Sequence, residues 1–191
     1  MQYRPLCDTG IDVSVLCLGT MTFGEQNTEQ EAFEQLDTAL DSGVNFIDTA
    51  EMYSVPPREE TMGSTERIIG RWLHARGCRD RVVIATKVAG PGRDWLPYVR
   101  GGGNRLDRGN IQAAVEGSLR RLQTDVIDVW QFHEVNYDND PDWIFQADGA
   151  IEAAVAARRA GKIRFIGFTG HKSPHILSKM LAQDFDWDTC Q

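Results

Sequence analysis

Residues 43–53, GVNFIDTAEMY, contain a short apolar run that ends abruptly in a carboxylate. The apolar residues are β-branched or aromatic and follow a glycine, which predicts a buried strand over residues 44–48. Asp48 closes this strand, and Tyr53 follows five residues later. Taken alone, the acid could be a turn residue and the tyrosine a loop aromatic, or both could belong to an active site.

Strand and helix patterns alternate along the rest of the chain, after a predicted hairpin whose turn is residues 8–10. Strands are predicted over 13–18, 44–48, 82–87, 126–133 and 163–169, with another beginning within 185–191. Helices are predicted from the N-cap Thr28 to near Gly43, over 64–76, from after Asp107 to about Leu122, over about 148–160, and from Pro174 onward. This alternation predicts an α/β fold with a parallel sheet, either doubly wound or a (β/α)8 TIM barrel.

Titratable side chains stand at the ends of three successive predicted strands. They are Asp48, Lys87 and His133, and Tyr53 lies one short loop beyond the first. Each residue alone has an ordinary structural interpretation, but the strand ends of a parallel sheet share one face, where a barrel carries its active site. Their common position therefore favours the barrel. A whole barrel takes about 250 residues, so residues 1–191 are expected to form one domain, truncated after about five and a half βα units.

Composition narrows the classes of partner and compartment. The formal net charge of -8 does not suit a nucleic-acid partner, because phosphate binding needs a basic face. The sequence has no apolar run of about 18 residues and no charged-then-apolar leader, so no membrane partner is expected. The four cysteines are far apart, as in reduced cytoplasmic proteins. No metal is expected, because Pro174 separates His171 from His175 and no acid accompanies them. The oligomeric state is left open.

Five segments together resemble the aldo-keto reductase family. They are LGTMTFG (18–24), GVNFIDTAEMY (43–53), ATK (85–87), DVIDVWQFH (125–133) and GKIRFIGFTG (161–170). The resemblance extends to the last residue and implies a TIM barrel that reduces a small-molecule aldehyde or ketone to an alcohol. NADP(H) is the family's usual cofactor, although nothing in the sequence excludes NAD(H).

The resemblance also assigns roles to individual residues. It implies a catalytic tetrad in which Tyr53 is the general acid, Lys87 and Asp48 tune it, and His133 orients the carbonyl. It implies cofactor contacts at Gly19, Thr20, Met21, Asp48, Thr169, Gly170 and Gln191. A free tyrosine has a pKa of about 10, and an ammonium about 4 Å away is worth on the order of 4 kcal/mol at an effective dielectric of about 20. Lys87 is therefore expected to lower the pKa of Tyr53.

Two departures from the family pattern lie near the expected site. Thr169-Gly170-His171 stands where the family usually has a Ser-Asn pair, so the amide role is expected to pass to the Gly170 backbone or to His171. A proline-bearing rim loop, SVPPREETMGS (54–64), follows Tyr53 and is expected to shape the substrate pocket. RGGGN (100–104) lacks the ending of a phosphate loop and is predicted to be a flexible loop.

Other functions stay open on the sequence alone. Lys87 could form a Schiff base, as in barrel aldolases, although the neighbouring Asp48 disfavours this. The chain could also be a catalytically inactive reductase-like fragment or a partner-binding scaffold. As a fragment it is expected to dissolve poorly, because open sheet edges invite aggregation, and to show no measurable NADPH binding alone.

Overall fold

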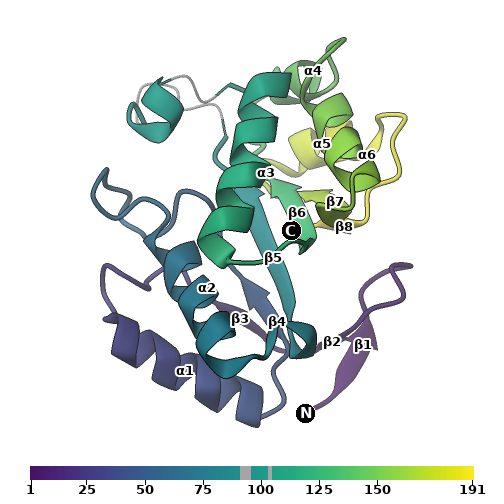
Figure 1. The fold of residues 1–191 in the computed structure, drawn as a ribbon. Coiled ribbons are helices and arrows are strands. Elements are labelled where there is room, and N and C mark those ends of the chain that lie inside the picture. The colour runs from purple at the N-terminus through teal and green to yellow at the C-terminus, as the bar shows by residue number, and fades with distance from the viewer. Residues whose placement is uncertain (91–95, 103–104) are drawn as a thin grey trace.

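The computed structural model describes residues 1–90, 96–102 and 105–191. Its main sheet is parallel, has six strands in sequence order, and curls into a half-barrel (Figure 1). The strands are β3 (Cys17–Gly19), β4 (Phe46–Asp48), β5 (Val83–Val88), β6 (Ile127–Phe132), β7 (Ile163–Phe168) and β8 (Thr189–Cys190). The predicted parallel α/β architecture is thus confirmed, and the curl agrees with a truncated barrel rather than a flat doubly wound sheet.

Helices connect these strands and cover the outside of the curled sheet (Figure 1). They are α1 (Glu29–Asp41), α2 (Ser64–Arg76), α3 (Arg108–Leu122), α4 (Asp140–Ile144), α5 (Ala150–Arg159) and α6 (Pro174–Leu181), with short 3-10 turns at Arg79–Arg81 and Val99–Gly102. Thr28 and Glu31 form the predicted capping box, in which each side chain accepts a hydrogen bond from the other's backbone N–H. None of the described helices is long and apolar enough to cross a membrane.

The predicted strand over residues 13–18 is in fact two strands. Its first part is β2 (Asp12–Ser14), which pairs antiparallel with β1 (Tyr3–Pro5) in a separate hairpin. Its last part belongs to β3 and pairs parallel with β4. Val15 and Leu16 between them are exposed, so the chain changes sheets at a point where the alternating sequence pattern alone showed no break.

One further helix was missed by the sequence prediction, and two predicted segments are shorter or only partly described. The short helix α4 (Asp140–Ile144) was not predicted, although Pro141 in its first turn is a typical helix-start signal. The final strand is only Thr189–Cys190. Within the predicted loop 100–104, the part that the structure describes ends in a 3-10 turn, and residues 103–104 lie outside the described residues.

The core lies between the sheet and its helices. Trp72 on α2 and Trp130 on β6 are fully buried there. Gly70 lets α2 approach α3 closely, because a Cβ at this position would lie 2.2 Å from the carbonyl oxygen of Arg121. A buried polar link crosses this contact: Glu66 on α2 accepts hydrogen bonds from Thr86 Oγ1 at 2.6 Å and from Arg121 Nε at 2.6 Å.

Candidate active site

The inner face of the half-barrel carries Asp48 and Lys87 side by side. Strand register places Asp48 opposite Ala85, and Lys87 lies two residues further along β5, so both side chains lie on the same face. Lys87 Nζ donates to Asp48 Oδ2 at 2.6 Å and to the carbonyl oxygen of Thr49 at 2.8 Å. The Lys87 side chain is 2% exposed and that of Asp48 is 14% exposed, so the ammonium is withdrawn from water and the carboxylate keeps a small exposed part.

Burial changes the proton affinity of both partners. It lowers the pKa of Lys87 and raises the pKa of Asp48, because each charge has lost most of its water. The opposite charge of the partner works against both shifts. Each group therefore needs the opposite charge of its partner to stay ionised in this buried position.

Tyr53 lies above this ion pair and against His133. Its ring centroid is 5.0 Å from Lys87 Nζ and 5.8 Å from the His133 ring, which it meets edge-on at 78°. The expected net lowering of the Tyr53 pKa is not found in this structure. Burial raises that pKa, and the negative charges of Asp48 and Glu134 raise it further. Tyr53 therefore stays protonated at neutral pH.

His133 follows β6 directly and is 5% exposed. Burial, with help from the positive charge of Lys87 and from His171, holds the pKa of His133 well below its usual value. The imidazole is therefore neutral at physiological pH. Its Nδ1 atom is buried and has no hydrogen-bond partner among the residues that the structure describes.

The residues expected to contact the cofactor differ in whether they are accessible to a ligand. Gly19 is exposed, and a Cβ added there would meet nothing within 4 Å, so the backbone at the end of β3 is open to a ligand. Met21 is also exposed. In contrast, Thr20 is fully buried and donates its hydroxyl to the carbonyl oxygen of Asp48 at 2.8 Å, so it holds β4 rather than facing the barrel interior.

At the other edge of the sheet, one of the two backbone groups of Gly170 that were expected to serve the amide role, its N–H, is already engaged. That N–H donates to the backbone carbonyl of Gln191 at 3.1 Å and is not free for a ligand. Thr169 is buried, and its hydroxyl accepts a hydrogen bond from the Glu134 N–H at 3.0 Å. The amide that faces Gln191 is Gln131, whose Nε2 lies 3.4 Å from Gln191 Oε1. Strand parity places Gln131 on the same face as Lys87, its register partner.

Sequence reasoning missed Glu51, which lies inside the opening motif between Asp48 and Tyr53. Glu51 is 2% exposed, accepts a hydrogen bond from the Ala89 N–H at 2.9 Å, and forms an ion pair with Arg100. The signal in the sequence was a carboxylate within a stretch of apolar and small residues, which indicates a buried charge with a specific partner. The Glu51 contacts hold the loop that carries Tyr53 against β5.

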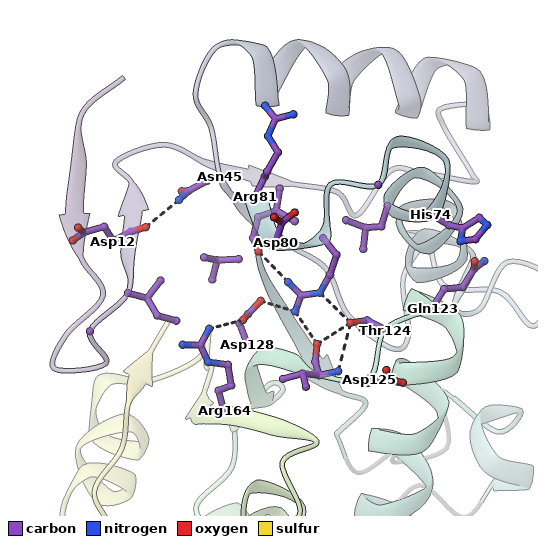
Figure 2. Close-up of a pocket in the computed structure, with 18 residues that line it drawn as sticks. Asp12, Asn45, His74, Asp80, Arg81, Gln123, Thr124, Asp125, Asp128 and Arg164 are labelled. Carbon is purple, nitrogen blue, oxygen red and sulfur yellow. Dashed lines mark hydrogen bonds and ion pairs between the residues drawn. The ribbon is translucent and has the colours of Figure 1, made fainter.

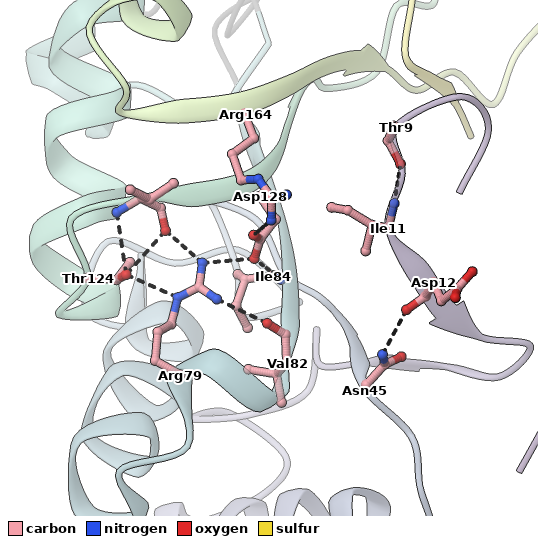
Figure 3. Close-up of polar contacts among 11 residues, drawn as sticks. Thr9, Ile11, Asp12, Asn45, Arg79, Val82, Ile84, Thr124, Asp128 and Arg164 are labelled. Carbon is pink, nitrogen blue, oxygen red and sulfur yellow. Dashed lines mark hydrogen bonds and ion pairs between the residues drawn. The ribbon is translucent and has the colours of Figure 1, made fainter. Parts of the chain in front are cut away.

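A cavity of about 930 Å³ lies at the opposite, amino-terminal ends of the strands and contains none of the expected site residues (Figure 2). Part of the wall of this cavity is formed by a network of charged side chains. Arg79 donates to Asp128 at 2.8 Å and to the Val126 carbonyl at 2.7 Å, and Arg164 reaches the other oxygen of Asp128 at 2.9 Å (Figure 3). These contacts join the starts of β5, β6 and β7, so this network is structural.

A family model described as the aldo/keto reductase family matches residues 15–191. The chain belongs to this family. It is 44% identical to "Protein tas" of Escherichia coli over 199 aligned residues, covering 96% of the chain and 56% of that relative. It is 36% identical to "Aldo-keto reductase YhdN" of Bacillus subtilis, covering 87% of the chain and 46% of that relative.

Solved structures agree with this assignment. The crystal structure of PA4992 from Pseudomonas aeruginosa superposes with a TM-score of 0.69 at 33% identity, covering 88% of the chain and 60% of that structure. The aldo/keto reductase fold of the chain is thus established, and with it an oxidoreductase family whose members act on small-molecule carbonyls. The chain spans about half the length of the curated relatives it matches.

Proposed function

We propose that this chain carries the catalytic half of an NADP(H)-dependent reductase that converts an aldehyde or ketone to an alcohol. The observation that supports the proposal best is the buried Lys87–Asp48 ion pair beneath Tyr53, with His133 against the tyrosine ring. One face of the half-barrel thus offers a protonated phenol, a fixed ammonium and a neutral imidazole around one point.

The chemistry follows from the charges of these residues. When bound, a nicotinamide cofactor would supply a hydride to the carbonyl carbon, and negative charge would gather on the carbonyl oxygen. Tyr53 is protonated at neutral pH, as any tyrosine is, and donates its proton to that oxygen; burial raises its pKa, so the charge that develops on the oxygen must drive the transfer. His133, neutral and buried, orients the oxygen by a hydrogen bond, and the Lys87 ammonium stabilises the negative charge that remains on Tyr53.

The inner face fits a planar amide-bearing ligand in part. Gly19 leaves open backbone on the edge strand β3, and the side-chain amides of Gln131 on β6 and of Gln191 after β8 lie 3.4 Å apart across the sheet. We assign these three residues, with Met21 and Asp48, to the nicotinamide side of the site. The preference for NADP(H) over NAD(H) and the cytoplasmic location remain predictions from the family resemblance and from the dispersed cysteines.

The contacts of Lys87 count against the Schiff-base alternative. An amine that attacks a carbonyl must first lose its proton, and Lys87 Nζ donates to both Asp48 and the Thr49 carbonyl. Breaking those hydrogen bonds would leave Asp48 buried without a partner.

The test is turnover of the 191-residue chain with NADPH or NADH and a panel of aldehydes and ketones, measured as the loss of the reduced cofactor's absorbance. Any turnover would also show that the expectation of no measurable NADPH binding by the chain alone is wrong. Tyr53→Phe should abolish turnover and leave cofactor binding, measured by fluorescence quenching, nearly unchanged. Retained turnover in Tyr53→Phe would overturn the assignment of the general acid. Cofactor binding without turnover on any substrate would favour the alternative of an inactive scaffold.

A further inference from the structure

Three side chains with metal-ligating atoms meet on the rim of the sheet, and one of them, His133, is also a residue of the expected tetrad. His133, Glu134 and His171 each offer one ligand atom, and these atoms all lie within 4.8 Å of one another. His133 and Glu134 follow β6, and His171 follows the neighbouring strand β7, so the parallel sheet brings them together. Two imidazoles and one carboxylate are a donor set that suits Zn²⁺ and other first-row divalent cations.

Hydrogen bonds between the two loops hold these residues near one another. Thr169 accepts two of them, from the Glu134 N–H to its hydroxyl at 3.0 Å and from the Val135 N–H to its carbonyl at 2.8 Å. Asn136 accepts a third at 2.9 Å from the His171 N–H. The backbones on both sides of the cluster are therefore fixed before any ligand binds, which lowers the ordering cost of binding.

The state of His133 also suits ligation. Its buried Nδ1 has no hydrogen-bond partner among the described residues, so the ring has a nitrogen that no other side chain or backbone group engages. A cation bound at one ring nitrogen fixes the proton on the other. His171 is exposed and Glu134 is partly exposed, so an ion can reach the cluster from solvent. The nearby positive charge of Lys87 is compensated by Asp48.

We propose that His133, Glu134 and His171 form a binding site for a divalent transition cation, with Zn²⁺ the best fit. Three protein ligands leave a coordination position open to water or to a substrate oxygen. Binding itself does not depend on the proposed reductase activity. Its consequence does: an ion that engages His133 takes that imidazole away from the substrate carbonyl, so the cation would inhibit the reductase.

The experiment is titration of the 191-residue chain with Co²⁺, whose visible absorption reports coordination by nitrogen and oxygen, followed by displacement with Zn²⁺. No cofactor or substrate is present, so failure of the reductase proposal would not affect the result. We expect one Co²⁺ per chain, with His171→Ala and Glu134→Gln each weakening binding by more than about tenfold. Both positions reach the surface, so these variants should keep the fold.

The matched control is His175→Ala, which removes an exposed histidine that lies four residues from His171, outside the cluster. This variant should bind Co²⁺ as the parent does. Binding that survives both cluster substitutions, or that is lost in His175→Ala, would overturn the site. Absence of binding up to about 1 mM Co²⁺, a free energy of only about -4 kcal/mol, would also overturn it. A sulfur-to-cobalt charge-transfer band would assign the ion to the exposed cysteines and refute the proposal in the same way.

Discussion

Removing one partner of the Lys87–Asp48 pair should destabilise the protein far more than removing both. At 2.6 Å and an effective dielectric of about 20, the attraction between the charges is about 6 kcal/mol, against several kcal/mol of lost hydration for each ion. In Asp48→Asn the attraction disappears and the desolvation of Lys87 remains. The folded chain can then relieve the strain only by releasing the lysine proton.

The cost of that release sets the size of the effect. Starting from the ordinary value of 10.5, keeping Lys87 neutral at pH 7 costs at most about 4.8 kcal/mol, at about 1.36 kcal/mol per pH unit. We therefore expect Asp48→Asn to lose between about 3 and 5 kcal/mol of unfolding free energy, the range seen when one partner of a buried pair is removed. The Asp48→Asn/Lys87→Met double variant buries no charge here and should lie within about 2 kcal/mol of the parent.

Urea unfolding followed by tryptophan fluorescence measures these values, since Trp72 and Trp130 are fully buried. The pH dependence gives a second signature. In Asp48→Asn the folded state holds Lys87 neutral while the unfolded state protonates it, so stability should rise by about 1.4 kcal/mol per pH unit from about pH 7 to about pH 9. The double variant should lack this slope. Losses that simply add in the double variant, or a flat pH profile in Asp48→Asn, would refute the reasoning.

Three further predictions concern other described contacts. Asp128→Ala should lose about 1 to 3 kcal/mol in the same urea assay, because it leaves the buried Ile84 N–H without an acceptor and removes one acceptor from each of two partly exposed arginines. In an ultraviolet titration, Tyr53→Phe and the parent should release equal numbers of phenol protons up to about pH 11, and an extra early proton in the parent would contradict the raised pKa of Tyr53. Hydrogen bonds from Arg76 and Trp72 lower the pKa of Asp37 below its ordinary value of 3.8. The ionised carboxylate therefore stabilises the fold at any pH above that value. Asp37→Asn should cost less than about 1 kcal/mol at neutral pH after solvent screening, and the difference should shrink as the pH falls below 3.8 and the carboxylate becomes protonated.

The common placement of three candidate site residues could be predicted because it depends on sequence periodicity. Asp48, Lys87 and His133 lie at strand ends, and a parallel sheet brings such ends to one face whatever the details of the connecting helices. The capping box at Thr28 is equally local, since its two partners are three residues apart. Both features follow from short segments of the chain.

Features that depend on burial and on distant partners could not be predicted. The direction of the Tyr53 pKa shift follows from its burial and from Glu134, which lies far away in sequence. The change of sheet at Val15 and Leu16 depends on which neighbours each half of the segment finds. The Gly170 N–H donates to the backbone carbonyl of Gln191, a contact that becomes visible only in the folded chain.

The position of Tyr53 is set by β5 rather than by the loop on which it lies. Beyond the end of β4, the Thr49 N–H donates to the Ala85 carbonyl at 2.9 Å and the Glu51 N–H donates to the Lys87 carbonyl at 2.9 Å, which continues the strand pairing. The Glu51 side chain then accepts from the Ala89 N–H. A loop tied to β5 at three points has little freedom, so Tyr53 is fixed relative to Lys87 by contacts between neighbouring strands. The geometry that supports proton donation is therefore contained within the described part of this chain.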